Sequence, residues 1–197
     1  MNTPRFSGNF TLPNKYFDQA MNAWWQIPLS PEMDKNHSLY GQDMFISFNN
    51  DELLRKITTG FIHCSATQPD WMAGRPATEK AAEIDRWHRS HGWDGFGYHG
   101  LIDRDGTFVK GRPDETPGAH ARGYNENSVS VVLVGGHGSN KNDRFLDHYT
   151  REQQQALLHW MDEMRAAYPG IKFRGHNEVA AKACPGFRVK DWLNGVE

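Results

Sequence analysis

Residues 175–187 read Gly-His-Asn-Glu-Val-Ala-Ala-Lys-Ala-Cys-Pro-Gly-Phe, and the interpretation of the whole chain starts from this stretch. It places an imidazole, His176, eight positions before a thiol, Cys184, with the ammonium of Lys182 two residues before the thiol. Histidine and cysteine are both good zinc ligands, and a nearby lysine favours the thiolate. Pro185 stops any helix at this point, so the chain can loop back and bring the two side chains together. The stretch therefore predicts two ligands of a metal site.

The best third ligand is His63, within the stretch Phe-Ile-His-Cys-Ser-Ala-Thr at residues 61–67. Residues 57–66 are rich in β-branched and apolar side chains, which indicates a buried strand with His63 near its C-terminal end. Neighbouring side chains on a strand point to opposite faces. Cys64 is therefore expected to be a core thiol and not a fourth ligand.

Length and composition bound the class of protein. The chain has 197 residues, a formal net charge of -2 and 12% aromatic residues, which suits one globular domain with an appendage. So small a net charge gives no reason to expect nucleic acid or an anionic membrane as a partner. No apolar run approaches the roughly 18 residues that a membrane span requires, so no membrane insertion is expected. Two cysteines provide no disulfide framework.

The first 50 residues differ from the rest in being rich in Pro, Asn and aromatic residues. We interpret residues 1–50 as an N-terminal extension that either packs on the main domain or extends its substrate groove, with the main domain at 51–197. The N-terminus lacks the apolar centre of a secretory signal. Synthesis in a cytoplasm is therefore expected, and any action outside it would need a separate helper for export.

Periodicity predicts an alternation of strands and helices after residue 51. The strand at 57–66 is followed by a helix over 79–91 capped by Thr78, with Ala82, Ile84, Trp87 and His88 available for its buried side. A hairpin pairs 98–102 with 107–110, a long polar loop covers 111–127, and 129–134 is a central strand. Thr150 caps a long amphipathic helix to about 168, 171–174 is a short strand, and 189–193 is a helical turn. This order predicts an α/β fold with a single central mixed sheet flanked by helices.

Five motifs occur in an order that resembles a known family. They are Phe61 to Thr67, Gly92-Trp93 before Gly97-Tyr98-His99, Arg104 to Thr107, Ala119 to Asn125, and Lys182 to Pro185. Together they resemble the zinc-dependent N-acetylmuramoyl-L-alanine amidases of the phage lysozyme and peptidoglycan-recognition-protein type, above all the small amidase lysozymes of short-tailed coliphages. The resemblance covers roughly residues 57–193, and several ordered motifs are more specific than any one alone.

The resemblance implies a role for each matched residue. The zinc ligands of the family fall on His63, His176 and Cys184, with one Zn²⁺ per chain. The catalytic tyrosine falls on Tyr98 and the catalytic lysine on Lys182, and either could carry the proton to the leaving amine. The resemblance also implies the amidase fold and a groove over the metal.

Other polar residues are assigned with less support from the pattern. His120 and Asn125, in the long loop, are candidate substrate-binding residues, although Asn125 also suits the role of fixing the loop's turn. His88 and His91 lie near a predicted helix C-terminus. There we expect them to be partners of the helix dipole or surface groups.

The resemblance implies a phage endolysin that cuts the amide between N-acetylmuramic acid and L-alanine in peptidoglycan by means of zinc-activated water. Such an enzyme would be made in the host cytoplasm and act on the cell wall in the periplasm, with a holin or other helper for export. Two alternatives come from other classes. One is a module that binds peptidoglycan without cutting it, and the other is a regulator of an intracellular partner such as RNA polymerase.

Overall fold

The computed structural model describes residues 55–195, and the interpretation of residues 1–50 lies outside this range. Within the described range, five strands form one sheet in the order β3-β2-β4-β1-β5. Their bounds are β1 (Thr59–Cys64), β2 (Gly100–Ile102), β3 (Phe108–Lys110), β4 (Ser128–Leu133) and β5 (Lys172–Gly175). The pairs β2–β4, β4–β1 and β1–β5 are parallel, whereas β2–β3 is an antiparallel hairpin. The expected mixed sheet is confirmed.

The two central strands, β4 and β1, carry the core on both faces of the sheet. Every residue of β4 is buried, as its Val-rich composition predicts for a strand covered on both sides. In the parallel register, His63 lies beside Val132, and Cys64 lies beside Leu133. Since side chains alternate, His63 and Cys64 point to opposite faces.

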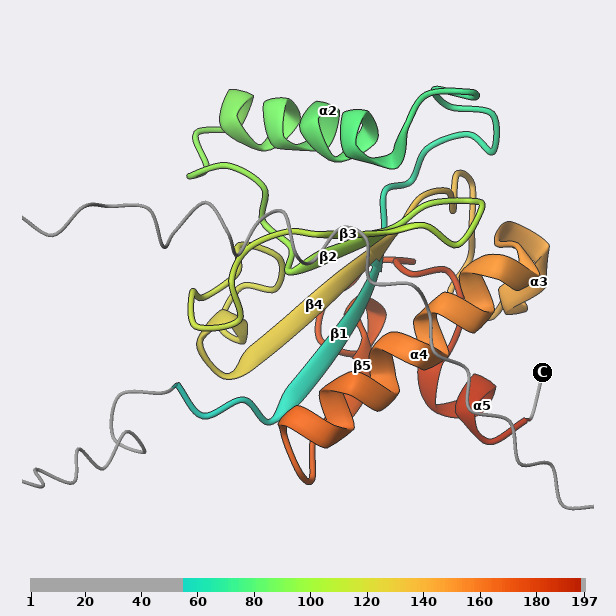
Figure 1. Cartoon of the computed structure of the whole chain (residues 1–197). Helices are drawn as coiled ribbons and strands as arrows, with labels where there is room; N and C mark the ends of the chain where they lie inside the picture. The colour runs from blue at the N-terminus through green and yellow to red at the C-terminus, as the bar shows by residue number, and fades with distance from the viewer. Residues whose placement is uncertain (1–54, 196–197) are drawn as a thin grey trace, which may run out of the picture. The chain divides into compact units, whose positions relative to one another are not determined.

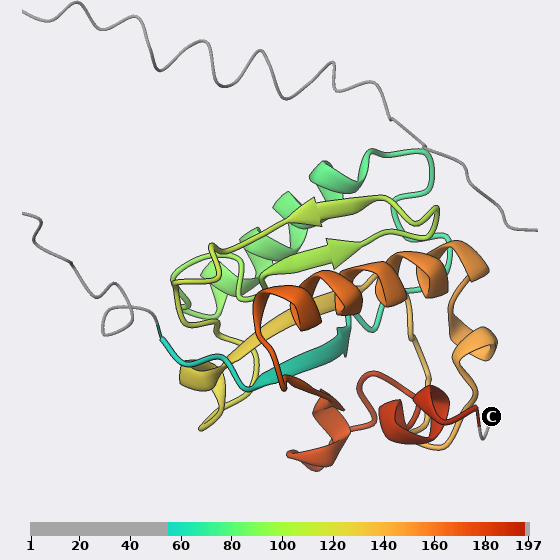
Figure 2. The same ribbon diagram turned by 60° about the horizontal axis from the view of Figure 1, so that its bottom comes forward.

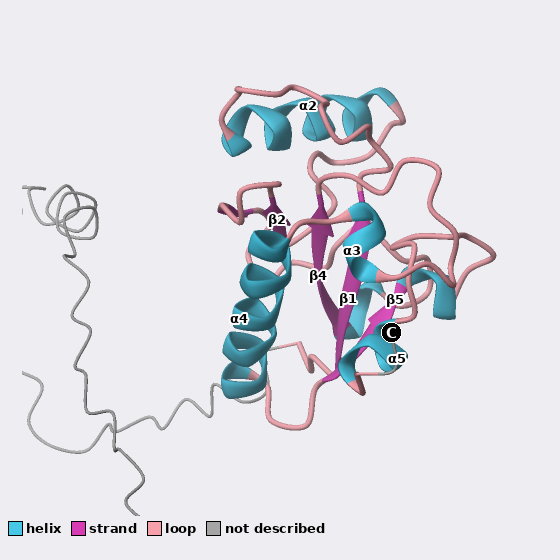
Figure 3. Cartoon of the chain, turned by 90° about the vertical axis from the view of Figure 1, so that its right-hand side faces the viewer, coloured by secondary structure: helices cyan, strands magenta, loops and turns pink. Residues whose placement is uncertain are grey.

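Helices cover the two faces. The helix α2 (Ala77–Ser90) packs on one face against Leu101 and Val132. The helices α3 (Phe145–His148), α4 (Arg151–Ala167) and α5 (Val189–Leu193) pack on the other, around a core that contains Ile62 and Leu133. Figure 1 and Figure 2 show α2 and α4 on opposite sides of the sheet, and Figure 3 shows α3, α4 and α5 beside the strands. Two 3-10 turns, η3 (Asn125–Asn127) and η4 (His176–Glu178), complete the described elements.

The start of α2 differs from the prediction, and its buried side differs at one predicted position. Pro76 precedes the helix and makes no side-chain cap, whereas Thr78 lies inside the first turn. Proline holds φ near the helical value, so it can start the helix without a capping hydroxyl. Ala82 is exposed, while Lys80 is buried and forms an ion pair with Asp103 at 2.8 Å. Ile84 and His88 are buried and Trp87 packs against the core, as predicted. The partner of Lys80 allows its charge to be buried on the same side of the helix.

The helix α4 agrees with the prediction. The Thr150 hydroxyl accepts a hydrogen bond from the Gln153 amide at 3.1 Å, which caps the helix as expected. Leu157, Trp160 and Met161 are buried against the sheet. Gln153 is buried as well, because its side-chain amide donates to the carbonyl oxygens at the ends of β2 and β4. Through Gln153, this helix therefore contacts the C-terminal ends of both strands.

Candidate metal centre and groove

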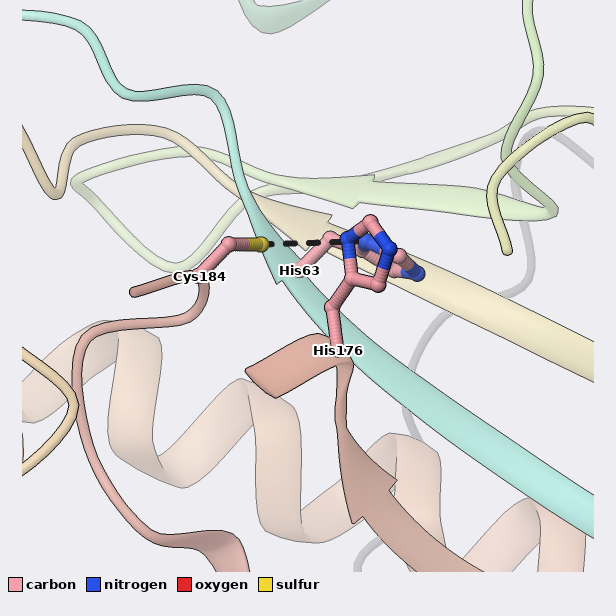
Figure 4. Close-up of side chains that lie close together, drawn as sticks. All are labelled: His63, His176 and Cys184. Atoms are coloured by element: carbon pink, nitrogen blue, oxygen red, sulfur yellow. Dashed lines mark hydrogen bonds between the residues drawn. The ribbon is translucent and has the colours of Figure 1, made fainter. Parts of the chain in front are cut away.

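The structure brings His63, His176 and Cys184 together. One ligand atom from each lies within 4.8 Å of those of the other two. Figure 4 shows the two imidazoles and the thiol facing one another across the end of β1. The convergence on which the predicted metal site depends is present.

The β1–β5 register explains how the two histidines meet. The strands are parallel, and Ile62 pairs with Gly175. The residue after each of these two is a histidine, so His63 and His176 both lie at the carboxyl end of the sheet, with ring centroids 4.6 Å apart. Carboxyl ends of neighbouring parallel strands meet in this way in α/β folds. The pairing of two strands that are remote in sequence thus places two of the three clustered side chains.

The loop after η4 delivers the thiol. The backbone amide of Asn177 donates to the Cys184 carbonyl at 2.6 Å, and the Asn177 side chain donates to Phe187 O at 3.0 Å. The amide of Cys64 donates to Cys184 Sγ at 3.2 Å. A backbone N–H that donates to sulfur stabilises the thiolate. Cys64 itself packs against the core and is outside the ligand cluster, as its position on the strand predicts.

The geometry of the cluster fits zinc. A tetrahedral zinc, with bonds of about 2.3 Å to sulfur and about 2.0–2.1 Å to nitrogen, requires the two ligand atoms to be about 3.6 Å apart. Cys184 Sγ and His63 Nδ1 are 3.7 Å apart. Two imidazoles and a thiol also form the soft, mixed donor set that suits zinc better than calcium or magnesium.

The histidines of the cluster are held neutral, which is the form that binds metal. Burial, followed by the nearby His120 and His176, lowers the pKa of His63 well below its usual value. Burial and the charge of Lys182 lower the pKa of His176 as well. For the thiol the direction is opposite, since the contact with the Cys64 thiol and then burial raise the pKa of Cys184.

These shifts predict how many protons zinc binding releases. The raised pKa of Cys184 favours a thiol that must lose its proton to bind zinc, whereas the lowered pKa values of His63 and His176 favour rings that have no proton to lose. We therefore expect about one proton released per zinc at pH 6. Two histidines of ordinary pKa would add roughly 1.5 protons. Calorimetric titration with zinc, in buffers of different ionisation enthalpy, measures the number; a value above two would contradict the neutral histidines.

Tyr98 and Lys182 lie beside the cluster. The Tyr98 ring is 5.1 Å from the His63 ring, centroid to centroid. Burial, followed by the neighbouring thiols, raises the pKa of the Tyr98 phenol, so it keeps its proton. Tyr98 precedes β2 and is not part of the strand, contrary to the expected hairpin bounds. Lys182 is exposed, and its side chain borders the groove described next.

A groove of about 510 Å³ opens beside His176, and a second groove of about 420 Å³ shares Lys182 with it as a lining residue. The long loop supplies one wall of the first groove, with His120 and Asn125 among the lining residues. Asn125 Oδ1 also accepts the backbone N–H groups of His120 and Ala121, at 3.0 and 2.9 Å. Asn125 therefore holds the turn of the loop as well as lining the groove.

The histidine that helical periodicity placed on the buried side of α2 is buried, and the expectation of a surface group at His88 is wrong. His88 is 9% exposed, accepts the Gly97 amide at Nδ1 and packs 5.4 Å from the Tyr98 ring. It thereby supports the segment that carries Tyr98. His91 is exposed and contacts the Trp87 carbonyl, as a group at a helix end is expected to do. The predicted buried side separates these two histidines, because it includes His88, one turn after the buried Ile84, and not His91.

Comparison with known proteins assigns the family. The family model described as N-acetylmuramoyl-L-alanine amidase matches residues 53–187. The endolysin of Escherichia phage T7 is 43% identical to this chain over 132 residues, which are 67% of this chain and 82% of that protein. The matched segment contains all three clustered side chains, together with Tyr98 and Lys182.

Solved structures confirm the fold. The endolysin amidase LysCS from Clostridium intestinale is 23% identical, with a TM-score of 0.57, over 73% of this chain and 85% of that one. A tyrosine-to-phenylalanine mutant of Drosophila PGRP-LB in complex with tracheal cytotoxin is 24% identical, with a TM-score of 0.55, over 71% of this chain and 80% of that one. At such identities the likeness concerns the fold alone.

A mixed sheet with a His-His-Cys cluster at the ends of its parallel strands, beside a groove, is the architecture of an α/β domain of the amidase type. The chain belongs to the N-acetylmuramoyl-L-alanine amidase family. The expected family, fold class and endolysin amidase activity are thereby confirmed.

Proposed function

We propose that this endolysin amidase is a zinc enzyme with one Zn²⁺ per chain, held by His63, His176 and Cys184. The observation that carries the proposal is the convergence of these three side chains at the edge of a groove. A set of three protein ligands leaves one tetrahedral position open, which is typical of catalytic zinc and not of structural zinc. When bound, zinc would supply the acidity that activates water near neutral pH and polarises a carbonyl.

Tyr98 and Lys182 would stabilise the charge that develops on the carbonyl oxygen of the scissile amide. Tyr98 keeps its proton because its pKa is raised, so it suits the role of a hydrogen-bond donor. Lys182, at the border of the two grooves, presents an ammonium to the same region. A preorganised donor of this kind is worth about 3 kcal/mol in the transition state.

We assign the proton of the leaving amine to Lys182. The buried phenol of Tyr98 holds its proton tightly, so transfer from it is costly. The Lys182 ammonium is exposed and can exchange its proton with solvent after each turnover. Tyr98 then acts through its hydrogen bond alone.

The substrate proposed is peptidoglycan, cut at the amide between N-acetylmuramic acid and L-alanine. The matching family is named for the N-acetylmuramoyl-L-alanine bond, and a Drosophila relative is named a peptidoglycan-recognition protein. The two grooves that Lys182 lines would provide room for the sugar and for the peptide that the amide joins. No helix within residues 55–195 is long and apolar enough to cross a membrane. Access to the wall would then depend on a holin or another helper.

Digestion of purified peptidoglycan, followed by mass spectrometry, tests the proposal. The expected products are free stem peptides with an L-alanine amino terminus and glycan strands of unchanged length. Zinc measured on the same protein should be about one per chain. New glycan reducing ends would show a glycosidase instead, and stoichiometric binding of muropeptide without any product would show a binding module.

A further inference from the structure

A chain of buried polar contacts runs from the cluster into the domain. His63 Nε2 lies 3.1 Å from His120 Nδ1, and His120 Nε2 lies 3.3 Å from Ser128 Oγ. The Ser128 hydroxyl contacts the Tyr124 carbonyl oxygen at 2.7 Å. His63, His120 and Ser128 are 1%, 7% and 0% exposed, so water does not compete for these contacts. This series of hydrogen bonds ends at the Tyr124 carbonyl oxygen, which can only accept a hydrogen bond.

That last atom sets the direction of every hydrogen bond in the chain. A carbonyl oxygen only accepts, so the Ser128 hydroxyl donates to Tyr124 O. Ser128 Oγ is then free to accept from His120 Nε2–H, which leaves the lone pair of the neutral His120 ring on Nδ1. His120 Nδ1 accepts from His63 Nε2–H, so the lone pair of His63 is on Nδ1. His63 Nδ1 is the atom that faces Cys184 Sγ, at 3.7 Å.

We propose that His120 is a positioning residue that, together with Ser128, fixes the tautomer and the ring orientation of His63 for metal binding. The inference rests on the proposed zinc site and adds a role for a residue that also lines the groove. Outer hydrogen bonds of this kind hold metal-binding histidines in one orientation. Here the acceptor is a second imidazole whose own tautomer is determined by a backbone carbonyl.

The surroundings keep His120 in place for this role. Asn125 Oδ1 accepts its backbone N–H at 3.0 Å, which anchors the loop directly beside the imidazole. The Phe61 ring lies 5.7 Å from the His120 ring and 6.2 Å from the His63 ring, centroid to centroid, and fills the same side of the sheet. The His120 imidazole is thus held by its backbone, by packing and by both ring nitrogens.

Two substitutions of His120 separate the acceptor from the packing. Asparagine can place Oδ1 near the position of Nδ1 and accept from His63, whereas leucine fills the space and accepts nothing. We expect His120→Leu to weaken zinc binding by about 10- to 100-fold, and His120→Asn to stay within about threefold of the wild type. Competition for zinc with a chromophoric chelator measures both without any assay of activity. His159→Leu, at an exposed histidine of α4, is the matched control and should bind zinc like the wild type.

Ser128→Ala tests the far end of the chain and replaces the leucine variant if that variant does not fold. It removes the partner of His120 Nε2, so a loss smaller than that of His120→Leu is expected. Long-range ¹H–¹⁵N spectra of the zinc protein should show a protonated Nε2 on His63, and this proton should exchange faster with solvent in both Ser128→Ala and His120→Leu.

The outcomes distinguish this inference from the proposed function. Equal weakening by leucine and asparagine, or wild-type zinc affinity in His120→Leu and Ser128→Ala, would overturn the positioning role while the zinc site stands. A wild-type protein that binds no zinc would overturn both proposals.

Discussion

Cys184→Ser is expected to lose bound zinc and amidase activity together. A serine hydroxyl is a far weaker zinc ligand than a thiolate, because its proton is not lost near neutral pH. Zinc affinity should fall by more than the roughly 10- to 100-fold that the loss of an outer-sphere partner costs. Metal analysis after dialysis and turnover of purified peptidoglycan, on the same sample, measure both losses.

Cys64→Ala provides the matched control. Cys64 is the neighbour of His63 on β1, and its side chain packs against the core and contacts the Cys184 thiol without being one of the three clustered ligands. The bond from its backbone N–H to Cys184 Sγ does not require the Cys64 side chain. This variant should keep its zinc and its activity, with at most a modest loss of thermal stability. Full activity in Cys184→Ser would contradict the assigned ligand set. Loss of zinc in Cys64→Ala together with retention of zinc in Cys184→Ser would also contradict it.

Tyr98→Phe is expected to keep zinc and lose turnover. The substitution removes only a hydroxyl, so the ring that packs 5.1 Å from His63 is preserved. Loss of one oxyanion donor costs about 3 kcal/mol, which is about a 10²- to 10³-fold decrease in kcat. Zinc content and the KM for a soluble muropeptide should change little, because the donor is needed when charge develops and not for binding. Steady-state kinetics together with metal analysis give these quantities.

Tyr124→Phe is the comparison for that experiment. Tyr124 is 43% exposed, and the hydrogen bond that it accepts from Ser128 uses its backbone carbonyl and not its phenol. It should therefore retain wild-type kcat. Equal kcat in Tyr98→Phe and the wild type would remove Tyr98 from the proposed mechanism while leaving the metal site intact.

Elements with long, consistent periodicity were predictable from the sequence. The central strand near 129–134 and the capped helix from Thr150 were both correct, since burial and local propensity favour the same structure there. For the helix after Pro76, the predicted buried side was correct at Ile84 and His88 and wrong at Ala82, and the burial of Lys80 was not predicted. An apolar scale cannot anticipate that, since the burial depends on Asp103, which lies 23 residues further along the chain.

The chemistry of the cluster was readable from residue types, whereas the partners of its members were not. A histidine and a cysteine eight positions apart, with a second histidine on a strand, were enough to name the three candidate ligands. Nothing in their spacing showed that His120 would lie 3.1 Å from His63, or that His88 would pack beside Tyr98.

The amino-acid sequence by itself determined the alternation of strands and helices, the donor set suited to zinc and the family, because each depends on local patterns or on residue identity. The tertiary structure decided where those donors meet. The pairing of Ile62 with Gly175 places two histidines side by side, and a loop held by Asn177 brings in the thiol. Register between strands more than 100 residues apart is settled by the packing of the whole sheet, so it is absent from any single stretch.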